Sequence, residues 1–281
     1  MAMLRPQTIG EALELRADHP EASFLAGGTG ILPDLNAGRL RPSLIIDLTS
    51  IHDWRAVDRA GSALRLSAGV TYTQLLTEVA AEQPLLAQAV RSIASPQLRN
   101  RATIAGALAI GDPSGDALAA LVACDAQIEM ASARRGERRV AAESFVTGFG
   151  CSVMAADELI TAIHMPIADG PVAYAKVGAR NAMARAIAGV ALVLDPTRRQ
   201  VGCGVVGVSA TAVRPRDAER RAAARWADGS EGADDFGAAV ANAITTPVGD
   251  SRASGDYRRH AARILARRAF ARAWAELAMR P

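Results

Sequence analysis

Two loops with almost no side-chain bulk are the strongest constraint on how this chain can fold. The first, Ala-Gly-Gly-Thr-Gly at residues 26–30, follows a strand-like segment at residues 23–25. The second, Thr-Ile-Ala-Gly-Ala at residues 103–107, precedes a turn that brings Asp116 to the start of an apolar helix. Backbone amides in such loops can point together at an anion. Two of them in one chain suggest a long ligand held at both ends of a diphosphate.

The spacing of the first loop narrows the classes of ligand that it could bind. Glycine pairs also form ordinary tight turns, so this loop alone fits a structural role as well as ligand binding. It lacks the G-x-G-x-x-G spacing of a Rossmann fingerprint, and no acidic residue ends a second strand in the expected βαβ unit. It also lacks the Gly-Lys-Ser/Thr ending of a Walker loop. The spacing therefore disfavours nicotinamide and nucleoside-triphosphate binding.

Composition limits the classes of partner. The 281 residues are half hydrophobic, enough for a sizeable core in two domains or in one domain with a large appendage. With 32 basic residues, 29 acidic residues and 4% aromatics, nucleic acid is not an expected partner. No apolar run reaches the roughly 18 residues of a membrane span, and no signal-peptide pattern follows Met1. We therefore expect a cytoplasmic protein without a membrane span.

The cysteines and histidines form no pattern typical of a metal site. Single cysteines among apolar or small residues are most simply buried thiols of a reducing compartment. The histidines form no His-x-His or His-Glu-x-x-His pair. The residues concerned are Cys124, Cys151, Cys203, His19, His52, His164 and His260. We expect no metal in this chain, so any metal chemistry must come from another subunit.

Lysine usage singles out one position. Among the 32 basic residues only Lys176 is a lysine, and all the others are arginines. A lysine that persists in such a chain is a candidate for a role that needs a compact ammonium group, which the planar guanidinium of arginine does not reproduce. The lysine could equally well have been kept by chance, so Lys176 only indicates where a functional site could lie.

Hydrophobic patterning before residue 168 predicts two lobes of an α+β domain. The first lobe, about residues 1–52, has a helix at residues 9–16 and short strands at residues 23–25 and 44–47. The second lobe, about residues 53–168, has a strand and then a helix that Thr71 and Gln74 begin as a capping box. Its further expected elements are helices at residues 85–93 and 116–123 and strands at residues 63–68, 127–131, 138–140 and 159–164.

A smaller domain is expected after the sequence Asp-Gly-Pro at residues 169–171. Residues 171–281 read as an antiparallel sheet followed by helices, with strands at residues 173–177, 187–194 and 201–208. The last helix, residues 257–277, repeats arginine with apolar residues in an amphipathic pattern, which is more typical of a solvated or subunit-facing helix than of a nucleic-acid patch. Its arginines are Arg258, Arg259, Arg263, Arg267, Arg268 and Arg272.

Several motifs, in order along nearly the whole chain, resemble one family. They are Leu-Ala-Gly-Gly-Thr-Gly-Ile-Leu at residues 25–32, Ala-Thr-Ile-Ala-Gly at 102–106, Pro-Ser-Gly-Asp at 113–116, Asp-Glu-Leu-Ile at 157–160, Tyr-Ala-Lys-Val-Gly-Ala-Arg at 174–180 and Ser-Gly-Asp-Tyr-Arg-Arg at 254–259. The chain thus resembles the FAD-binding medium subunit of molybdenum hydroxylases, such as carbon monoxide dehydrogenase and xanthine dehydrogenase. The resemblance implies a two-lobed FAD-binding domain of the PCMH type at residues 1–168 and a medium-subunit domain at residues 171–281.

The resemblance also implies an FAD site spread over both loops. Their backbone amides would bind the diphosphate, Asp116 would accept hydrogen bonds from flavin-side hydroxyls, and Ile160 would lie near the isoalloxazine ring. Lys176 would sit beside the flavin, where a cation stabilises the anionic reduced form. On sequence alone, Asp116 fits a helix cap as well. The residues assigned to the site are Leu25, Ala26, Gly27, Gly28, Thr29, Gly30, Ile31, Leu32, Ala102, Thr103, Ile104, Ala105, Gly106, Ala107, Asp116, Ile160 and Lys176.

Three alanines depart from the family pattern. The second loop usually reads Thr-x-Gly-Gly-Asn, whereas this chain has Ala105 and Ala107 there. If position 105 needs a positive φ, alanine costs on the order of 1 kcal/mol and weakens FAD binding. Ala107 removes a polar side chain that the family often uses on the cofactor. Ala184 replaces an acidic residue, which puts a local ion pair in doubt.

The implied function is electron transfer with non-covalent FAD and no catalytic residue of its own. A large subunit would oxidise the substrate at molybdopterin, and electrons would pass through [2Fe-2S] clusters of a small subunit to the flavin here and then to an external acceptor. One alternative is a self-contained flavin oxidoreductase, with His164 or Tyr174 as its acid–base residue. The other is a structural subunit that has lost FAD.

Overall fold

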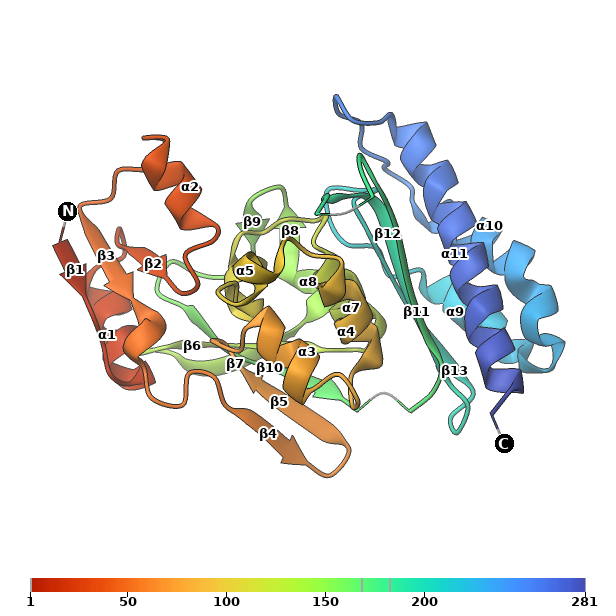
Figure 1. Cartoon of the computed structure of the whole chain (residues 1–281), viewed down its shortest axis with the longest axis horizontal. Helices are drawn as coiled ribbons and strands as arrows, with labels where there is room; N and C mark the ends of the chain where they lie inside the picture. The colour runs from red at the N-terminus through yellow and green to blue at the C-terminus, as the bar shows by residue number, and fades with distance from the viewer. Residues whose placement is uncertain (1, 168, 182, 281) are drawn as a thin grey trace.

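The chain folds into three units arranged in sequence order from the N-terminus to the C-terminus (Figure 1). The computed structural model describes residues 2–167, 169–181 and 183–280. Residues 1, 168 and 281, where the predicted domains begin or end, lie outside the described residues. Each of the three units has its own main β-sheet, and helices cover these sheets.

The first unit is a small parallel sheet with strand order β1-β3-β2. Thr8 begins its first helix, because the Thr8 side chain accepts a hydrogen bond from the amide of Glu11. The central strand is buried along its whole length. The elements of this unit are β1 (Ala2–Leu4), α1 (Ile9–Asp18), β2 (Ser23–Leu25), α2 (Ile31–Asn36), β3 (Leu44–Asp47) and the 3-10 turn η1 (Leu48–Ser50).

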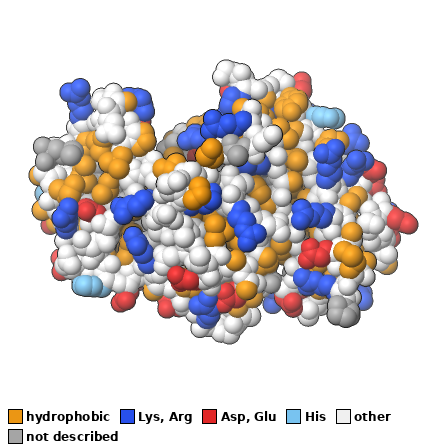
Figure 2. All heavy atoms as spheres, viewed as in Figure 1, with side chains coloured by type: hydrophobic (Ala, Val, Ile, Leu, Met, Phe, Trp, Pro, Cys, Tyr) orange, Lys and Arg blue, Asp and Glu red, His pale blue; other side chains and the backbone are white. Residues whose placement is uncertain are grey.

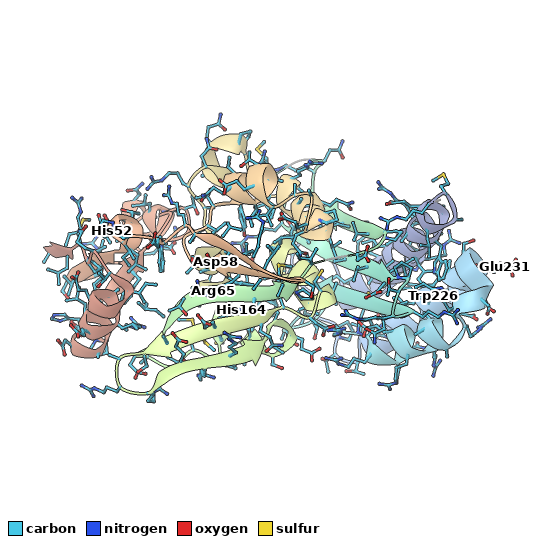
Figure 3. All side chains as sticks on the ribbon, turned by 90° about the horizontal axis from the view of Figure 1, so that it is seen from below. His52, Asp58, Arg65, His164, Trp226 and Glu231 are labelled. Carbon is cyan, nitrogen blue, oxygen red and sulfur yellow. The ribbon has the colours of Figure 1, made fainter. Side chains whose placement is uncertain are left out.

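The second unit is a five-stranded antiparallel sheet with strand order β4-β5-β10-β6-β7. One face is apolar and almost fully buried, as Leu66 and Ile163 show, whereas the other face carries Asp58, Arg65 and His164 in a row across three strands (Figure 3). This alternation is what a sheet with one covered face requires. The strands are β4 (Val57–Ala60), β5 (Ala63–Ser67), β6 (Gln127–Ser132), β7 (Gly136–Ala141) and β10 (Leu159–Pro166).

Helices cover the apolar side of that sheet, and one of them, α6, contains most of the second glycine segment, residues 103–107. The predicted capping box is confirmed, since Thr71 and Gln74 each bond the other's backbone at the start of α3. The helices are α3 (Tyr72–Glu78), α4 (Pro84–Arg91), α5 (Pro96–Arg99), α6 (Ile104–Ala109), α7 (Asp116–Ala123) and α8 (Ala142–Phe145). The hairpin of β8 (Val146–Gly148) and β9 (Cys151–Ser152) forms a small separate sheet.

The third unit is an antiparallel sheet, β11-β12-β13, between two helical layers. Helices α4 and α7 of the second unit pack on one side of the sheet, and α9 and α11 pack against it from the third unit (Figure 1). Phe236, Phe270 and Trp274 anchor the outer helices, with the two phenylalanine rings stacked 4.6 Å apart. The elements are β11 (Val172–Gly178), β12 (Ala186–Asp195), β13 (Gln200–Val206), α9 (Arg216–Ala224), the 3-10 turn η2 (Trp226–Gly232), α10 (Ala233–Ala243) and α11 (Gly255–Ala278).

The predicted α+β fold class, with an antiparallel C-terminal sheet plus helices, is confirmed. Two expectations about burial are wrong. Arg258 is only 2% exposed, although the pattern of the last helix predicts that its arginines face solvent or another subunit. Cys151 is exposed in the β8–β9 hairpin, whereas Cys124 and Cys203 are buried as expected. No helix within the described residues is long and apolar enough to cross a lipid bilayer.

Candidate functional site

The first glycine loop, residues 26–30, connects β2 to α2 and packs against the segment before α6. A Cβ at Gly27 would lie 1.9 Å from the carbonyl oxygen of Arg101 and 3.1 Å from the Cα of Ala102. Only a residue without a side chain permits this approach. Gly27 therefore has no side chain because its backbone lies against the backbone of Arg101 and Ala102, just before the second segment.

The second segment is a helix start and not the loop that the sequence suggests. Thr103 is the N-cap of α6, and its Oγ1 accepts a hydrogen bond from the amide of Gly106 at 3.1 Å. Ala105 and Ala107 are good helix formers, which explains why the chain forms a helix here. Ala105 does not have a positive φ, so the strain expected for an alanine at this position does not arise.

The two segments leave unused backbone donors near one another. Within the described residues, the amides of Gly27, Gly28, Thr29 and Gly30 donate no hydrogen bond to the protein, and neither does the amide of Ala105. The methyl group of Ala26 would be 4.0 Å from a Cβ at residue 106 of α6. Free backbone amides at a loop and at a helix start suit an anionic ligand, and here both kinds lie close together.

The surface is hollowed close to these segments. Figure 2 shows a notch between the first unit and the rest of the molecule, on the side where α2 and α5 face each other in Figure 1. Leu32 on α2, Leu98 on α5 and Ile110 after α6 are each 46% exposed. Leu32 and Ile110 lie beside Gly28 and Gly30, and such apolar side chains next to free amides suit a ligand with a charged part and a flat apolar part.

Asp116 is the first residue of α7 and binds side chains of the third unit. Its Oδ2 lies 2.6 Å from Nζ of Lys176, and its Oδ1 accepts a hydrogen bond from the hydroxyl of Tyr174. Gly115 is the N-cap of α7, and no side-chain cap bond is made there. The alternative role of Asp116 as a helix cap is therefore wrong.

Lys176 is held by acceptors on three separate segments of the chain. Besides Asp116, its Nζ donates to the carbonyl of Ser92 at 3.1 Å and to the carbonyl of Ala184 at 2.9 Å. An ammonium group has three N–H donors, and all three are in use. Ala184 thus contributes its backbone carbonyl to this cluster.

Burial shapes the electrostatics of this cluster. It raises the pKa of Asp116, while the hydrogen bonds from Lys176 and Tyr174 act in the opposite direction. Burial also raises the pKa of Tyr174 well above its usual value, and the neighbouring carboxylate adds to that shift. Tyr174 therefore stays a neutral donor at ordinary pH.

Ile160 and His164 lie elsewhere on strand β10. Ile160 is buried in the main core, opposite Met130 and next to a β-bulge. The imidazole Nε2 of His164 is 2.7 Å from Oε2 of Glu129 on the outer face of the sheet. His164 thus belongs to a different cluster from Asp116, and the nearness of Ile160 to the flavin stays a prediction.

The third unit also contacts the turn before α7. The sequence pattern does not predict this contact. The amide of Gly207 donates to the carbonyl of Pro113 at 3.0 Å, and Arg185 pairs with Asp112 at 3.3 Å. One signal for the site is present in the sequence, because Tyr174 and Lys176 are two residues apart and therefore share a face of β11. The other contacts depend on packing between units that a sequence pattern does not encode.

A cavity of about 410 Å³ lies at the opposite end of α7 and is separate from this cluster. One of the arginines that line it, Arg214, pairs with Asp125 and Glu219 and is buried between the second and third units. The other arginines that line the cavity are Arg198, Arg216 and Arg220, and they pair with Asp195, Glu143 and Asp217. Among the described residues, no group of three or more His, Cys, Asp or Glu is placed to hold a metal ion.

Comparisons with known proteins agree on one family. Residues 1–168 match the family model described as the FAD binding domain in molybdopterin dehydrogenase. The chain is 31% identical to the carbon monoxide dehydrogenase medium chain of Hydrogenophaga pseudoflava, over 97% of this chain and 96% of that one. It is 32% identical to the nicotine 6-hydroxylase medium subunit of Paenarthrobacter nicotinovorans, over 76% and 77% of the two chains.

A solved structure has the same fold. The carbon monoxide dehydrogenase from Hydrogenophaga pseudoflava that lacks the Mo-pyranopterin moiety matches with a TM-score of 0.85 and 29% identity, covering 99% of this chain and 98% of that chain. The predicted resemblance, with FAD as the cofactor of this chain and an oxidoreductase subunit as its class, is confirmed. The chain belongs to the family of FAD binding domains in molybdopterin dehydrogenases.

Proposed function

We propose that this chain is the FAD-binding electron-transfer subunit of a multi-subunit molybdenum hydroxylase. It would accept electrons from [2Fe-2S] clusters of a small partner subunit and deliver them to an external acceptor. A large partner subunit would carry molybdopterin and oxidise the organic substrate. Similarity over almost the full length to a carbon monoxide dehydrogenase medium chain supports this role. FAD, when bound, supplies the capacity to accept and release electrons.

The observation that carries the proposal is the meeting of the two glycine segments. Their unused amides at Gly27, Gly28, Thr29, Gly30 and Ala105 form a group of donors that fits a diphosphate. The missing Cβ at residue 27 is what lets the segments approach. The residues present therefore fit the cofactor of the family.

We assign the site to the same residues that the sequence singles out. The amides of both segments would bind the diphosphate, and the side chains around them would enclose the rest of the cofactor. The assigned residues are Leu25, Ala26, Gly27, Gly28, Thr29, Gly30, Ile31, Leu32, Ala102, Thr103, Ile104, Ala105, Gly106, Ala107, Asp116, Ile160 and Lys176. We further propose that residues 1–168, in lobes of about 1–52 and 53–168, form the FAD-binding domain, and that residues 171–281 form the medium-subunit domain.

Lys176 would tune the electron affinity of the site from a fixed position. Its ammonium group favours negative charge that develops nearby, by Coulomb attraction in a partly desolvated region. Asp116 weakens this effect, because its carboxylate is 2.6 Å from the ammonium. The sign and size of the field thus depend on both residues, and Tyr174 helps to hold Asp116 in place.

The alternatives receive less support. A self-contained oxidoreductase needs an acid–base residue at the site, but His164 is engaged with Glu129 and the Tyr174 hydroxyl is engaged with Asp116. Backbone strain at Ala105 would support the hypothesis of a structural subunit that has lost FAD. Ala105 lies in the first turn of α6, however, and its φ is not positive, so this strain is absent. Both observations favour the electron-transfer role.

The assembly is tested by expressing the chain together with its two partner subunits. We expect the purified complex to contain iron and molybdenum as well as FAD. After removal of FAD, substrate should still bleach the iron–sulfur absorbance, while reduction of the acceptor should stop and return when FAD is added. Acceptor reduction that survives the removal of FAD would contradict the proposal, as would substrate oxidation by this chain alone.

A further inference from the structure

The segment at residues 254–259 is a motif of the sequence whose role the proposed function does not use. Ser254 begins α11, and its Oγ accepts a hydrogen bond from the amide of Tyr257 at 3.2 Å. Arg258, one residue later, points inward and is 2% exposed, whereas Arg263 and Arg268 of the same helix are less buried. A buried guanidinium is unfavourable unless it is paired and hydrogen-bonded, so the partners of Arg258 decide whether the fold tolerates it.

Arg258 binds two backbone carbonyls and one carboxylate. Its Nη1 donates to the carbonyl of Ile187 at 2.7 Å and to the carbonyl of Gly207 at 2.6 Å. Its Nη2 donates to Oδ1 of Asp250 at 2.6 Å. Helix α11 is thereby tied to β12 and to the loop that follows β13.

Gly207 connects this anchor to the proposed cofactor site. It has a φ of +77°, a conformation that glycine adopts readily and other residues rarely do. Its carbonyl is bound by Arg258, and its amide donates to the carbonyl of Pro113 at 3.0 Å. Both backbone polar atoms of Gly207 are thus used, one toward α11 and one toward the turn before α7.

That turn delivers Asp116. Within it, Oδ1 of Asp112 accepts hydrogen bonds from the amide and the hydroxyl of Ser114, at 2.9 Å and 2.6 Å, and the carbonyl of Asp112 accepts one from the amide of Gly115 at 3.1 Å. Asp116 follows as the first residue of α7. A displacement of Pro113 would therefore move a short, internally bonded turn as a unit.

We propose that Arg258 is a positioning residue for the cofactor site. It fixes Gly207 and, through the bond from Gly207 to Pro113, the turn that carries Asp116. The inference rests on the proposed FAD site. Two carbonyls and a carboxylate are reached by two nitrogens of one planar group, and the single ammonium nitrogen of lysine cannot occupy both positions.

The test compares Arg258→Lys with Arg268→Lys, a matched change at a less buried position of the same helix. Far-UV circular dichroism checks the fold, calorimetry gives the dissociation constant for FAD, and a redox titration gives the potential of the bound flavin. We expect Arg258→Lys to bind FAD about tenfold more weakly with a shifted potential, because a charge-assisted hydrogen bond is lost. Arg268→Lys should match the wild-type chain.

A second variant covers the case in which Arg258→Lys fails to fold. Asp250 is partly exposed, with 38% of its side chain accessible, and Asp250→Asn keeps the guanidinium while weakening its third contact. We expect a folded chain with FAD binding about threefold weaker and a smaller shift in potential. Folded variants with wild-type affinity and wild-type potential would overturn the positioning role but leave the proposed FAD site intact. A wild-type chain that does not bind FAD would overturn both.

Discussion

At the scale of single residues, the pair formed by Asp116 and Lys176 is the most demanding feature of the molecule. Both side chains are largely buried, with exposed fractions of 6% and 15%, and they come from different units of the fold. Removing one charge of a buried pair leaves the other without compensation, which costs more than the pair contributes when intact. Stability and electron affinity should therefore respond together to changes at this pair.

We predict that Lys176→Met lowers the free energy of unfolding by about 3 kcal/mol, because Asp116 remains buried without its cation. The same change should lower the reduction potential of the bound flavin, because it adds a net negative charge to the site. Urea unfolding and a redox titration of the whole chain check the two effects.

The double variant Lys176→Met with Asp116→Asn is the control for charge. It removes both members of the pair, so we expect it to recover most of the lost stability and to return the potential toward the wild-type value. An unchanged potential in Lys176→Met would exclude the electrostatic role of this lysine.

The sequence predicts some site residues better than others, for a physical reason. The lack of large side chains at residues 26–30 is a local property of the sequence. It correctly indicates that another backbone segment approaches this loop closely, as it does at Gly27. The pairing of Asp116 with Tyr174 and Lys176 joins positions far apart along the chain, as the separations of 58 and 60 show. The helix pattern predicts that Arg258 faces solvent or another subunit, because such a pattern does not reveal the two distant carbonyls that accept hydrogen bonds from its guanidinium.

At the scale of elements, the outer face of the five-stranded sheet carries a network centred on Glu129. This side chain is almost fully buried, and it accepts hydrogen bonds from Thr161 at 3.0 Å, from Arg139 at 3.1 Å and from Arg65 at 3.3 Å, while His164 lies within 2.7 Å. The donors come from β5, β7 and β10 and surround one residue of β6. Figure 3 shows Arg65 and His164 next to each other on this face.

The pKa of Glu129 makes the network sensitive to acid. Burial raises this pKa, but the hydrogen bonds from His164 and Thr161 and the charges of His164 and Arg65 together outweigh burial and lower the pKa from 4.5 to about 2. A depressed carboxyl pKa adds stability above the unfolded value, and that stability is lost as the pH falls toward the folded value. The contribution of Glu129 is thus complete above about pH 4.5 and declines between pH 4.5 and pH 2.

We predict that Glu129→Gln lowers the free energy of unfolding by about 1 kcal/mol near pH 6, a modest value because the arginines around it are partly solvated. Near pH 3 the difference from the wild-type chain should be smaller, since the wild-type carboxylate is then losing its advantage. Urea denaturation at both pH values measures this. A difference that grows as the pH falls would contradict this role of Glu129.

Elements with local signals are predictable, and those built from distant pairings are not. The capping box at Thr71 marks the start of α3, and the hairpin of β6 and β7 follows from a nearby turn. The sequence pattern misses strand β1, because β1 pairs with β3, some 40 residues later, and has no periodicity of its own. It predicts a loop at the start of α6, because the glycine there outweighs the helix propensity of the alanines beside it.

At the scale of the whole molecule, the third unit acts as a clamp on the second. Its sheet lies on α4 and α7, and four of its residues hold the turn that ends in Asp116, namely Tyr174, Lys176, Arg185 and Gly207. The two glycine segments meet between the first and second units instead. The proposed cofactor site is thus assembled from all three units, which explains why family motifs are spread over nearly the whole chain.

The central claim is that the meeting of the two glycine segments creates the FAD site. It is tested most directly by calorimetric titration of FAD into the wild-type chain, Gly27→Ala and Gly10→Ala. A methyl group at residue 27 would collide with the carbonyl of Arg101, whereas one at residue 10 meets only Oγ1 of Thr8 at an ordinary 3.8 Å. We predict one FAD per wild-type chain, equal affinity for Gly10→Ala, and affinity at least about tenfold weaker for Gly27→Ala. Absence of FAD binding by the wild-type chain, or wild-type affinity in a folded Gly27→Ala variant, would contradict the claim.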